Sequence, residues 1–114
     1  MVILSNKVTL CQSFWRKGTG LMFKKRTPDF AYVFPFNHPR RLVITMVFVF
    51  FPIDILFLKE GKVVEIARNV RPFSHYTPAH LADTFIEFPV GKVKRSFLGK
   101  RLVWNNQVVE MPDK

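Results

Sequence analysis

The chain has 114 residues, of which 48% are hydrophobic and 23% are charged, and its formal net charge is +10 at pH 7. This length suits one hydrophobic core, so we expect residues 1–114 to form a single domain. The hydrophobic fraction excludes an intrinsically disordered chain. The lone cysteine, Cys11, excludes an internal disulfide.

The basic excess indicates attraction to anions such as nucleic acid, phosphorylated metabolites or acidic membrane surfaces, and charge alone does not choose among them. The first residues lack the basic and apolar regions of a secretory signal, so we expect a cytoplasmic protein. The apolar run from Leu42 to Leu58 is interrupted by Pro52 and Asp54. It therefore favours buried strands over a transmembrane segment.

The first third of the chain predicts strands separated by turn residues. Residues 2–10 are rich in aliphatic and β-branched side chains and predict an opening strand. Residues 14–23 have a longer period and two glycines, which predicts one or two loose helical turns. Residues 30–36 predict a strand that ends at the Asn37-His38-Pro39 break.

The middle of the chain predicts the centre of a sheet. Residues 43–50 carry β-branched and aromatic side chains on both parities, which favours a central strand covered on both faces. Pro52 cannot donate a ladder hydrogen bond and should end or bend that strand before residues 53–58. Residues 59–62 then predict a hairpin turn to a strand at residues 63–70.

The last third begins with a segment without periodicity, from Arg71 to Ala82, which predicts a long surface loop held by aromatic residues and of a length often used for function. Residues 83–88 predict a strand, and residues 90–98 predict a short helix closed by Gly99. The Asn105-Asn106 pair predicts the turn of a final hairpin.

Several ordered motifs resemble one known family. They are Gly20-Leu21-Met22 followed by basic residues, Phe34 and Phe36, Phe51-Pro52-Ile53-Asp54 with Ile55-Leu56-Phe57-Leu58, Glu87-Phe88-Pro89-Val90-Gly91, and Leu98-Gly99. Together they resemble the small prokaryotic β proteins of domain of unknown function family one hundred and ninety-two. The resemblance implies a mostly β fold, a compact antiparallel barrel or jelly-roll-like sandwich with one or two short helical pieces. It implies no reaction, because the family has no established activity.

Two carboxylates lie in apolar surroundings, and each has a structural and a functional interpretation. Asp54 stands between Ile53 and Ile55, where it either accepts backbone N–H groups or serves as a raised-pKa acid in a pocket. We favour the structural role because a carboxylate beside a proline often fixes a turn. Glu87 either joins Asp54 in a pocket for a small polar ligand or pairs with a basic residue on a neighbouring strand.

The histidines and the cysteine do not predict a metal or cofactor site. His38, His75 and His80 lack the spacing of paired ligands, and no cysteine cluster accompanies them. Cys11 has no histidine near it in sequence, so a buried inert thiol is the favoured interpretation. We therefore expect neither a metal nor a cofactor.

Basic residues gather in two places. The first basic cluster comprises Arg16, Lys17, Lys24, Lys25 and Arg26, and the second basic cluster comprises Lys92, Lys94, Arg95, Lys100 and Arg101. The preferred hypothesis is a non-catalytic binding module whose basic surface takes an anionic ligand or partner, nucleic acid or another polyanion being the candidate. The alternative is an enzyme or a receptor for a small sugar-like ligand, with a pocket near Asp54 and Glu87. The simplest alternative to both is a solvated basic face without a partner.

Overall fold

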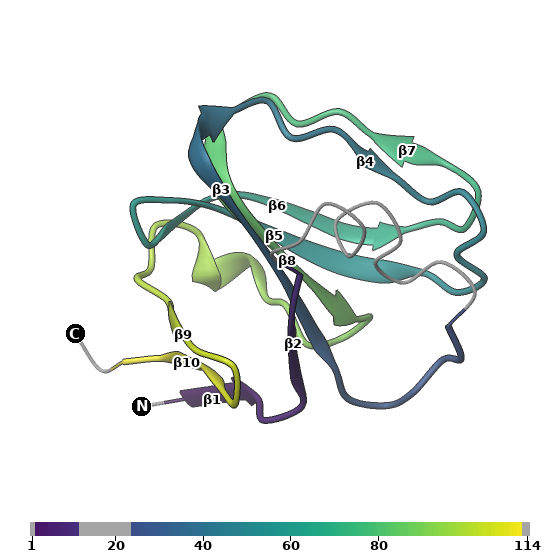
Figure 1. Ribbon diagram of the computed structural model, residues 1–114, viewed down its shortest axis with the longest axis horizontal. Helices are drawn as coiled ribbons and strands as arrows, with labels where there is room; N and C mark the ends of the chain where they lie inside the picture. The colour runs from purple at the N-terminus through teal and green to yellow at the C-terminus, as the bar shows by residue number, and fades with distance from the viewer. Residues whose placement is uncertain (1, 12–23, 113–114) are drawn as a thin grey trace.

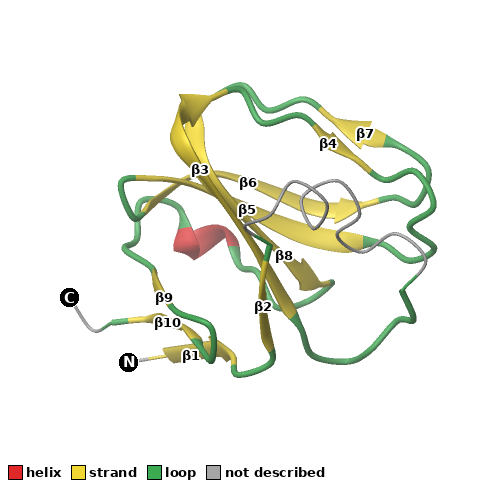
Figure 2. Cartoon of the chain, viewed as in Figure 1, coloured by secondary structure: helices red, strands yellow, loops and turns green. Residues whose placement is uncertain are grey.

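The computed structural model of the protein describes residues 2–11 and 24–112. The described elements are β1 (Val2–Ser5), β2 (Val8–Leu10), β3 (Ala31–Arg40), β4 (Ile44–Thr45), β5 (Ile53–Lys59), β6 (Lys62–Val70), β7 (His75–Tyr76), β8 (Ala82–Pro89), the 3-10 turn η1 (Arg95–Phe97), β9 (Val103–Trp104) and β10 (Val109–Met111). Figure 1 shows their arrangement in chain order, and Figure 2 shows that strands dominate the part of the chain that is described.

A five-stranded sheet with the order β2-β3-β8-β5-β6 forms the centre of the fold. Strand β5 lies between β8 and β6, and its residues 53–58 are all buried. This sheet is not wholly antiparallel, because β2 pairs with β3 in parallel, with Val8 opposite Ala31. The mostly β prediction is therefore confirmed, while the described strands form three sheets and close no barrel among themselves.

Each face of the central sheet supports a separate hydrophobic core. On one face, Ile55 and Phe57 of β5 pack with Ile44 of β4 and with Met46, which follows β4. On the other face, Leu56 of β5 shares a core with side chains of the β1-β10-β9 sheet and of η1, namely Leu4, Val109 and Phe97. Alternate residues of one strand thus serve opposite cores, as the two-residue period of a strand requires.

The hairpin between β5 and β6 follows the prediction closely. Lys59 pairs with Lys62 across a two-residue turn. The turn residues Glu60 and Gly61 have φ values of 53° and 81°. Positive φ at both positions defines the turn type that matches the right-handed twist of paired strands. The strand predicted at residues 83–88 is likewise present as β8.

The strand predicted at residues 43–50 is wrong in extent and in environment. Only Ile44 and Thr45 form a strand, β4, which pairs with β7 in a separate two-stranded sheet. Ile44 and Met46 are buried, whereas Val43 and Val47 are 56% and 40% exposed, so one face of the segment is exposed to solvent. The carbonyl of Met46 accepts hydrogen bonds from Val49 and Phe73, and this turn ends the strand.

Other boundaries differ for local reasons. The opening strand is broken after Ser5, whose hydroxyl accepts the N–H of Lys7 at 3.1 Å, and its halves β1 and β2 join different sheets. Strand β3 continues past Pro35 to Arg40 with an irregular register. The helix predicted at residues 90–98 is reduced to the single turn η1. The helical turns predicted at residues 14–23 lie outside the described residues.

Two further local predictions agree with the structure. The segment from Arg71 to Leu81 is a loop apart from the two residues of β7, and Ala82, the last residue of the predicted loop, begins β8. Strands β9 and β10 form the last hairpin, where the side-chain oxygen of Asn105 accepts the N–H groups of Gln107 and Val108.

Candidate functional site

The two buried carboxylates point to opposite faces of the central sheet. In the β5–β8 pairing, Asp54 lies opposite Phe88, whereas Glu87 lies opposite Ile55. Directly opposed residues share a face and successive residues alternate, so the two carboxylates belong to opposite faces. The structure therefore does not bring Asp54 and Glu87 into one pocket.

Asp54 is 1% exposed and its carboxylate accepts two backbone hydrogen bonds. One oxygen accepts the N–H of Asn69 at 2.8 Å, and the other accepts the N–H of Gly91 at 3.0 Å. Asn69 has a φ of 56° and lies at an irregularity in the β5–β6 register. Asp54 thus fixes a bulge in β6 and the turn after β8, which is the structural role that we favoured from the sequence.

Glu87 is buried on the face that carries the aromatic core. It is 6% exposed, and its neighbours in the register are Tyr32 on β3 and Ile55 on β5. Burial raises the pKa of Glu87 to about 8, because an ionised carboxylate loses its hydration there. At neutral pH this side chain is therefore mostly protonated.

The basic residues of the described part of the first cluster, Lys24, Lys25 and Arg26, are exposed in the segment before β3. Arg16 and Lys17 lie outside the described residues. This segment approaches the second basic cluster, because Lys92 Nζ lies 3.3 Å from Asp29 Oδ1. Lys92 of the second basic cluster thus contacts the segment that follows the first basic cluster.

The second basic cluster divides between two cavities. Arg95 lines a cleft of about 580 Å³ between β6 and η1. Lys100 and Arg101, together with Lys62, line a cavity of about 440 Å³ on the other side of Gly99. Lys94 is exposed and lines neither cavity.

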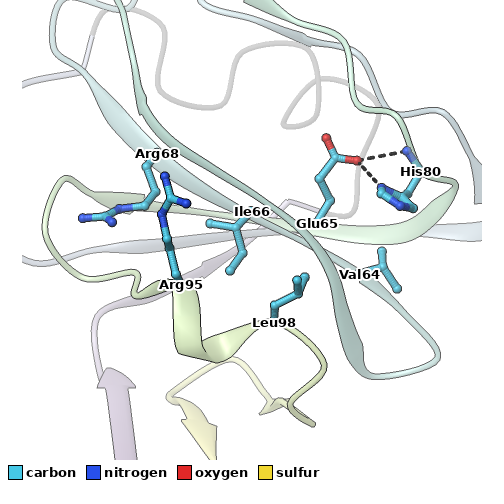
Figure 3. A pocket seen from close by; sticks show the side chains of 7 residues that line it. All are labelled: Val64, Glu65, Ile66, Arg68, His80, Arg95 and Leu98. Carbon is cyan, nitrogen blue, oxygen red and sulfur yellow. Dashed lines mark hydrogen bonds and ion pairs between the residues drawn. The ribbon is translucent and has the colours of Figure 1, made fainter.

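The cleft between β6 and η1 combines three chemical environments, as Figure 3 shows. Arg68 of β6 and Arg95 of η1 both line the cleft, and Figure 3 draws them toward the same end of it. Glu65 and His80 lie at the other end. The aliphatic side chains between the two ends are Val64, Ile66 and Leu98.

Hydrogen bonds saturate the carboxylate of Glu65. One oxygen accepts the hydroxyl of Tyr76 at 2.5 Å. The other accepts the N–H groups of Ala79 and His80, each at 2.9 Å, and lies 2.8 Å from His80 Nδ1. This carboxylate therefore ties the loop of residues 71–82 to the edge of β6.

The same contacts determine the protonation states of the network. Burial favours a higher pKa for Glu65, but the hydrogen bonds from Tyr76, His80 and Ala79 outweigh it and lower that pKa. Burial, followed by the bond to Glu65, raises the pKa of Tyr76 to about 12. An ionised carboxylate can only accept, so His80 Nδ1 is the donor and Nε2 is free of Glu65.

Unlike the carboxylate of Glu65, the guanidinium groups of Arg68 and Arg95 have no bonding partner among the described residues. Within residues 2–11 and 24–112, the guanidinium group of neither Arg68 nor Arg95 has an ion-pair or hydrogen-bond partner. Of the described residues that line the cleft, Glu65 is the one acid, and its lone pairs are directed at the donors already named. Two exposed guanidinium groups are thus presented together without a neutralising carboxylate.

Metal chemistry has no support in the described residues. No three histidine, cysteine, aspartate or glutamate side chains among them are placed to hold an ion. His38 and His75 are exposed on separate strands, while Cys11 is buried. Within the part that the structure describes, no helix is long and apolar enough to span a membrane.

Sequence reasoning found only part of this cleft. The second basic cluster includes Arg95, and the loop that contains Tyr76 and His80 has a length often used for function. Glu65 and Arg68 were missed, because each is an ordinary polar residue of an alternating strand in the sequence. The signal available was β6's position as a possible edge strand, where polar residues have room to project.

Comparisons with known proteins place the chain in a family. The family model for DUF192, described as "Uncharacterized ACR", matches residues 3–104. A UPF0127 protein of Pyrococcus furiosus is 27% identical over 104 residues, covering 90% of this chain and 90% of the relative. A UPF0127 protein of Pyrococcus horikoshii is 29% identical over 101 residues, covering 86% and 87%.

Two crystal structures are similar in fold. A candidate transcription regulator from Sinorhizobium meliloti has a TM-score of 0.71 at 24% identity, covering 91% of this chain and 80% of that one. A protein of unknown function from Novosphingobium aromaticivorans also has a TM-score of 0.71, at 23% identity, with coverage of 90% and 73%. At these identities the likeness shows the fold alone. With its family match over residues 3–104, the chain belongs to DUF192, the uncharacterised family whose motifs the sequence resembled.

Proposed function

We propose that the protein is a non-catalytic binding module that holds an anionic ligand in the cleft between β6 and η1. The observation that carries this proposal is the pairing of Arg68 and Arg95 at one end of the cleft, with Glu65 already saturated. Guanidinium groups bind carboxylates and phosphates through charge-assisted, bidentate hydrogen bonds.

The size and lining of the cleft support a ligand with both charged and apolar parts. Its volume of about 580 Å³ lies in the range of small-molecule and short-segment sites. The aliphatic middle, formed by Val64, Ile66 and Leu98, suits an apolar group next to the anion. The net charge of +10 adds long-range attraction for any such ligand.

The alternative with Asp54 and Glu87 finds less support. Asp54 is occupied by two backbone N–H groups, and Glu87 belongs to the opposite face of the sheet. A shared two-carboxylate pocket therefore does not explain either residue.

A titration with inorganic pyrophosphate, followed by amide and arginine side-chain NMR shifts, tests the proposal. We expect saturable shifts at Arg68 and Arg95. Arg68→Gln and Arg95→Gln should each weaken binding by about tenfold, which corresponds to one charge-assisted hydrogen bond.

Lys94→Gln is the matched control, because Lys94 is an exposed neighbour of Arg95 outside the cleft. It removes the same charge and should weaken binding less than about twofold if contact, rather than net charge, holds the ligand. Equal losses in all three variants, or no shift at Arg68 and Arg95, would contradict the proposal.

A further inference from the structure

In the part of the chain that the structure describes, the outer edge of β6 is largely unpaired. Strand β6 is the last strand of the five-stranded sheet, with β5 as its one neighbour in that order. Its first residues are covered, since Val63 donates to the carbonyl of Lys100 at 3.0 Å and accepts the N–H of Gly99 at 2.9 Å. From Val64 to Val70, no described segment pairs with the outer edge.

The register shows which backbone groups face outward. Val63 directs its N–H and C=O away from β5, so its pair with Leu58 is not hydrogen-bonded. Leu56 lies two residues from Leu58 on β5 and is opposite Ile66. Because hydrogen-bonded and non-hydrogen-bonded pairs alternate along a strand, the Leu56–Ile66 pair is also not hydrogen-bonded. Ile66 therefore presents an N–H and a C=O to the outside of the sheet.

The cleft follows this edge. Glu65 and Ile66 are successive strand residues with side chains on opposite faces, yet both line the cleft. A cleft that touches both must reach the edge of the strand. Its far wall is formed by Arg95 and Leu98 of the η1 segment, as Figure 3 shows.

The side chains around the edge define a pattern for an occupant. Ile66 and Arg68 lie two residues apart on one strand, and Leu98 and Arg95 line the same cleft from the η1 segment. A strand added beside β6 would place its own residues at the same two-residue period. An apolar residue two positions from an acidic one would match both pairs.

Nucleic acid is the competing occupant of a basic cleft, and the lining favours a peptide. Single-stranded nucleic acid binds through aromatic rings on which bases stack. Among the described residues, no phenylalanine, tyrosine or tryptophan lines this cleft, and the middle is aliphatic. Unpaired strand groups are instead complementary to the backbone of an extended peptide.

We propose that the ligand of this cleft is an extended acidic peptide segment that adds to the outer edge of β6, placing an apolar side chain at Ile66 and Leu98 and a carboxylate at Arg68 and Arg95. This rests on the proposed function and names its ligand class. The irregularities in the β5–β6 register near both ends of the segment keep the added strand short.

Capped peptides Thr-Val-Thr-Glu-Thr and Thr-Glu-Thr-Val-Thr, which cover both strand directions, test this proposal by NMR titration. We expect one of them to bind at Arg68 and Arg95, and to slow hydrogen exchange of the Ile66 amide by about tenfold or more, since that N–H gains a partner. Replacing the glutamate by glutamine should weaken binding by about tenfold.

N-methylation of the peptide supplies the matched control. In an added strand, the N–H groups of alternate residues point toward β6 and away from it. Methylating the set that points toward β6 blocks the hydrogen bonds, whereas methylating the other set does not. We expect binding to weaken by about tenfold when one set of alternate amides is methylated, and by less than about threefold when the other set is methylated. Equal losses, or tighter binding of oligo-dT than of either peptide to the same arginines, would overturn strand addition.

The outcomes separate this inference from the proposed function. Pyrophosphate binding at Arg68 and Arg95 without binding of either peptide would overturn the peptide proposal and leave the anion site standing. Absence of binding by pyrophosphate and by both peptides would overturn both.

Discussion

At the scale of single residues, Asp54 shows how a buried charge is held by backbone rather than by a basic partner. Its carboxylate satisfies the N–H groups of Asn69 and Gly91, whose φ values are 56° and 102°. Asp54→Asn replaces one acceptor oxygen with an NH2 group that cannot accept. One backbone donor is then left buried and unpaired, which costs about 1–3 kcal/mol.

Urea denaturation followed by circular dichroism measures this loss. Asp83→Asn is the control, because Asp83 also accepts a backbone N–H, that of Glu60 at 2.9 Å, in an exposed hairpin. There water can replace the bond, so we expect less than about 1 kcal/mol. An equal loss in both variants would show that burial of Asp54 is not the cause.

Glu87 makes stability depend on pH in the direction opposite to that of a salt-bridged acid. Its folded pKa is about 8, whereas an unfolded glutamate titrates near ~4.3. Between these values the unfolded state releases a proton that the folded state retains, so stability falls as pH rises. The loss is on the order of 1.4 kcal/mol per pH unit within this window.

Glu87→Gln removes the titration and should flatten the stability profile between about pH 5 and pH 8, relative to the wild-type protein. Urea midpoints measured across this range, at constant ionic strength, test the expectation. Parallel profiles for the two proteins would mean that Glu87 is not the group responsible.

At the scale of elements, Glu65 holds a long loop against an edge strand. Glu65 is a residue of β6, and its carboxylate accepts hydrogen bonds from the Tyr76 hydroxyl and from the backbone N–H groups of Ala79 and His80. Glu65→Ala removes the acceptor, so the Ala79 and His80 amides should exchange with solvent about tenfold faster or more. Hydrogen exchange followed by NMR gives the readout, and unchanged rates would show that the loop is held by other contacts.

The amides of Gln107 and Val108 provide an internal control for the same experiment. They donate to Asn105 in the β9–β10 hairpin, far along the chain from Glu65. Their exchange should be unaltered in Glu65→Ala. A general acceleration would indicate global destabilisation instead of release of the loop.

The elements also show which features a sequence can reveal. The β5–β6 hairpin was predictable because its turn and flanking strands are encoded locally, by Glu60-Gly61 and by apolar alternation. The strand at residues 43–50 was mispredicted because composition does not reveal which neighbour covers a side chain. Val43 and Val47 are β-branched and exposed, while Ile44 between them is buried.

The candidate site also combines features that the local sequence predicts with features that depend on long-range pairing. Arg95 was identified from charge clustering, but its partner Arg68 comes from another strand and no sequence spacing relates them. The separation of Asp54 from Glu87 depends on strand register, which fixes the face of each residue. The long-range pairing of strands therefore determines which of these side chains share a site, and local sequence patterns do not.

At the scale of the whole molecule, 18 lysines and arginines against 8 aspartates and glutamates give a formal net charge of +10. This excess gives the molecule a positive long-range field. Such a field accelerates encounter with an anionic partner, whereas contacts in the cleft determine how long the complex lasts.

This distinction leads to a kinetic prediction with the acidic peptide that binds the cleft. Combined Lys24→Gln, Lys25→Gln and Arg26→Gln substitutions remove exposed charge that does not line the cleft. The association rate should fall by about two- to tenfold and become less sensitive to salt, with little change in the dissociation rate.

Arg68→Gln should do the reverse, because it removes a contact and only one charge of the field. We expect the dissociation rate to rise by about tenfold and the association rate to change by less than about twofold. Stopped-flow measurements with a labelled peptide at low and high salt separate the two rates. If the triple variant instead accelerates dissociation, the segment before β3 contacts the ligand directly, and the binding surface extends from the cleft past the Asp29–Lys92 ion pair.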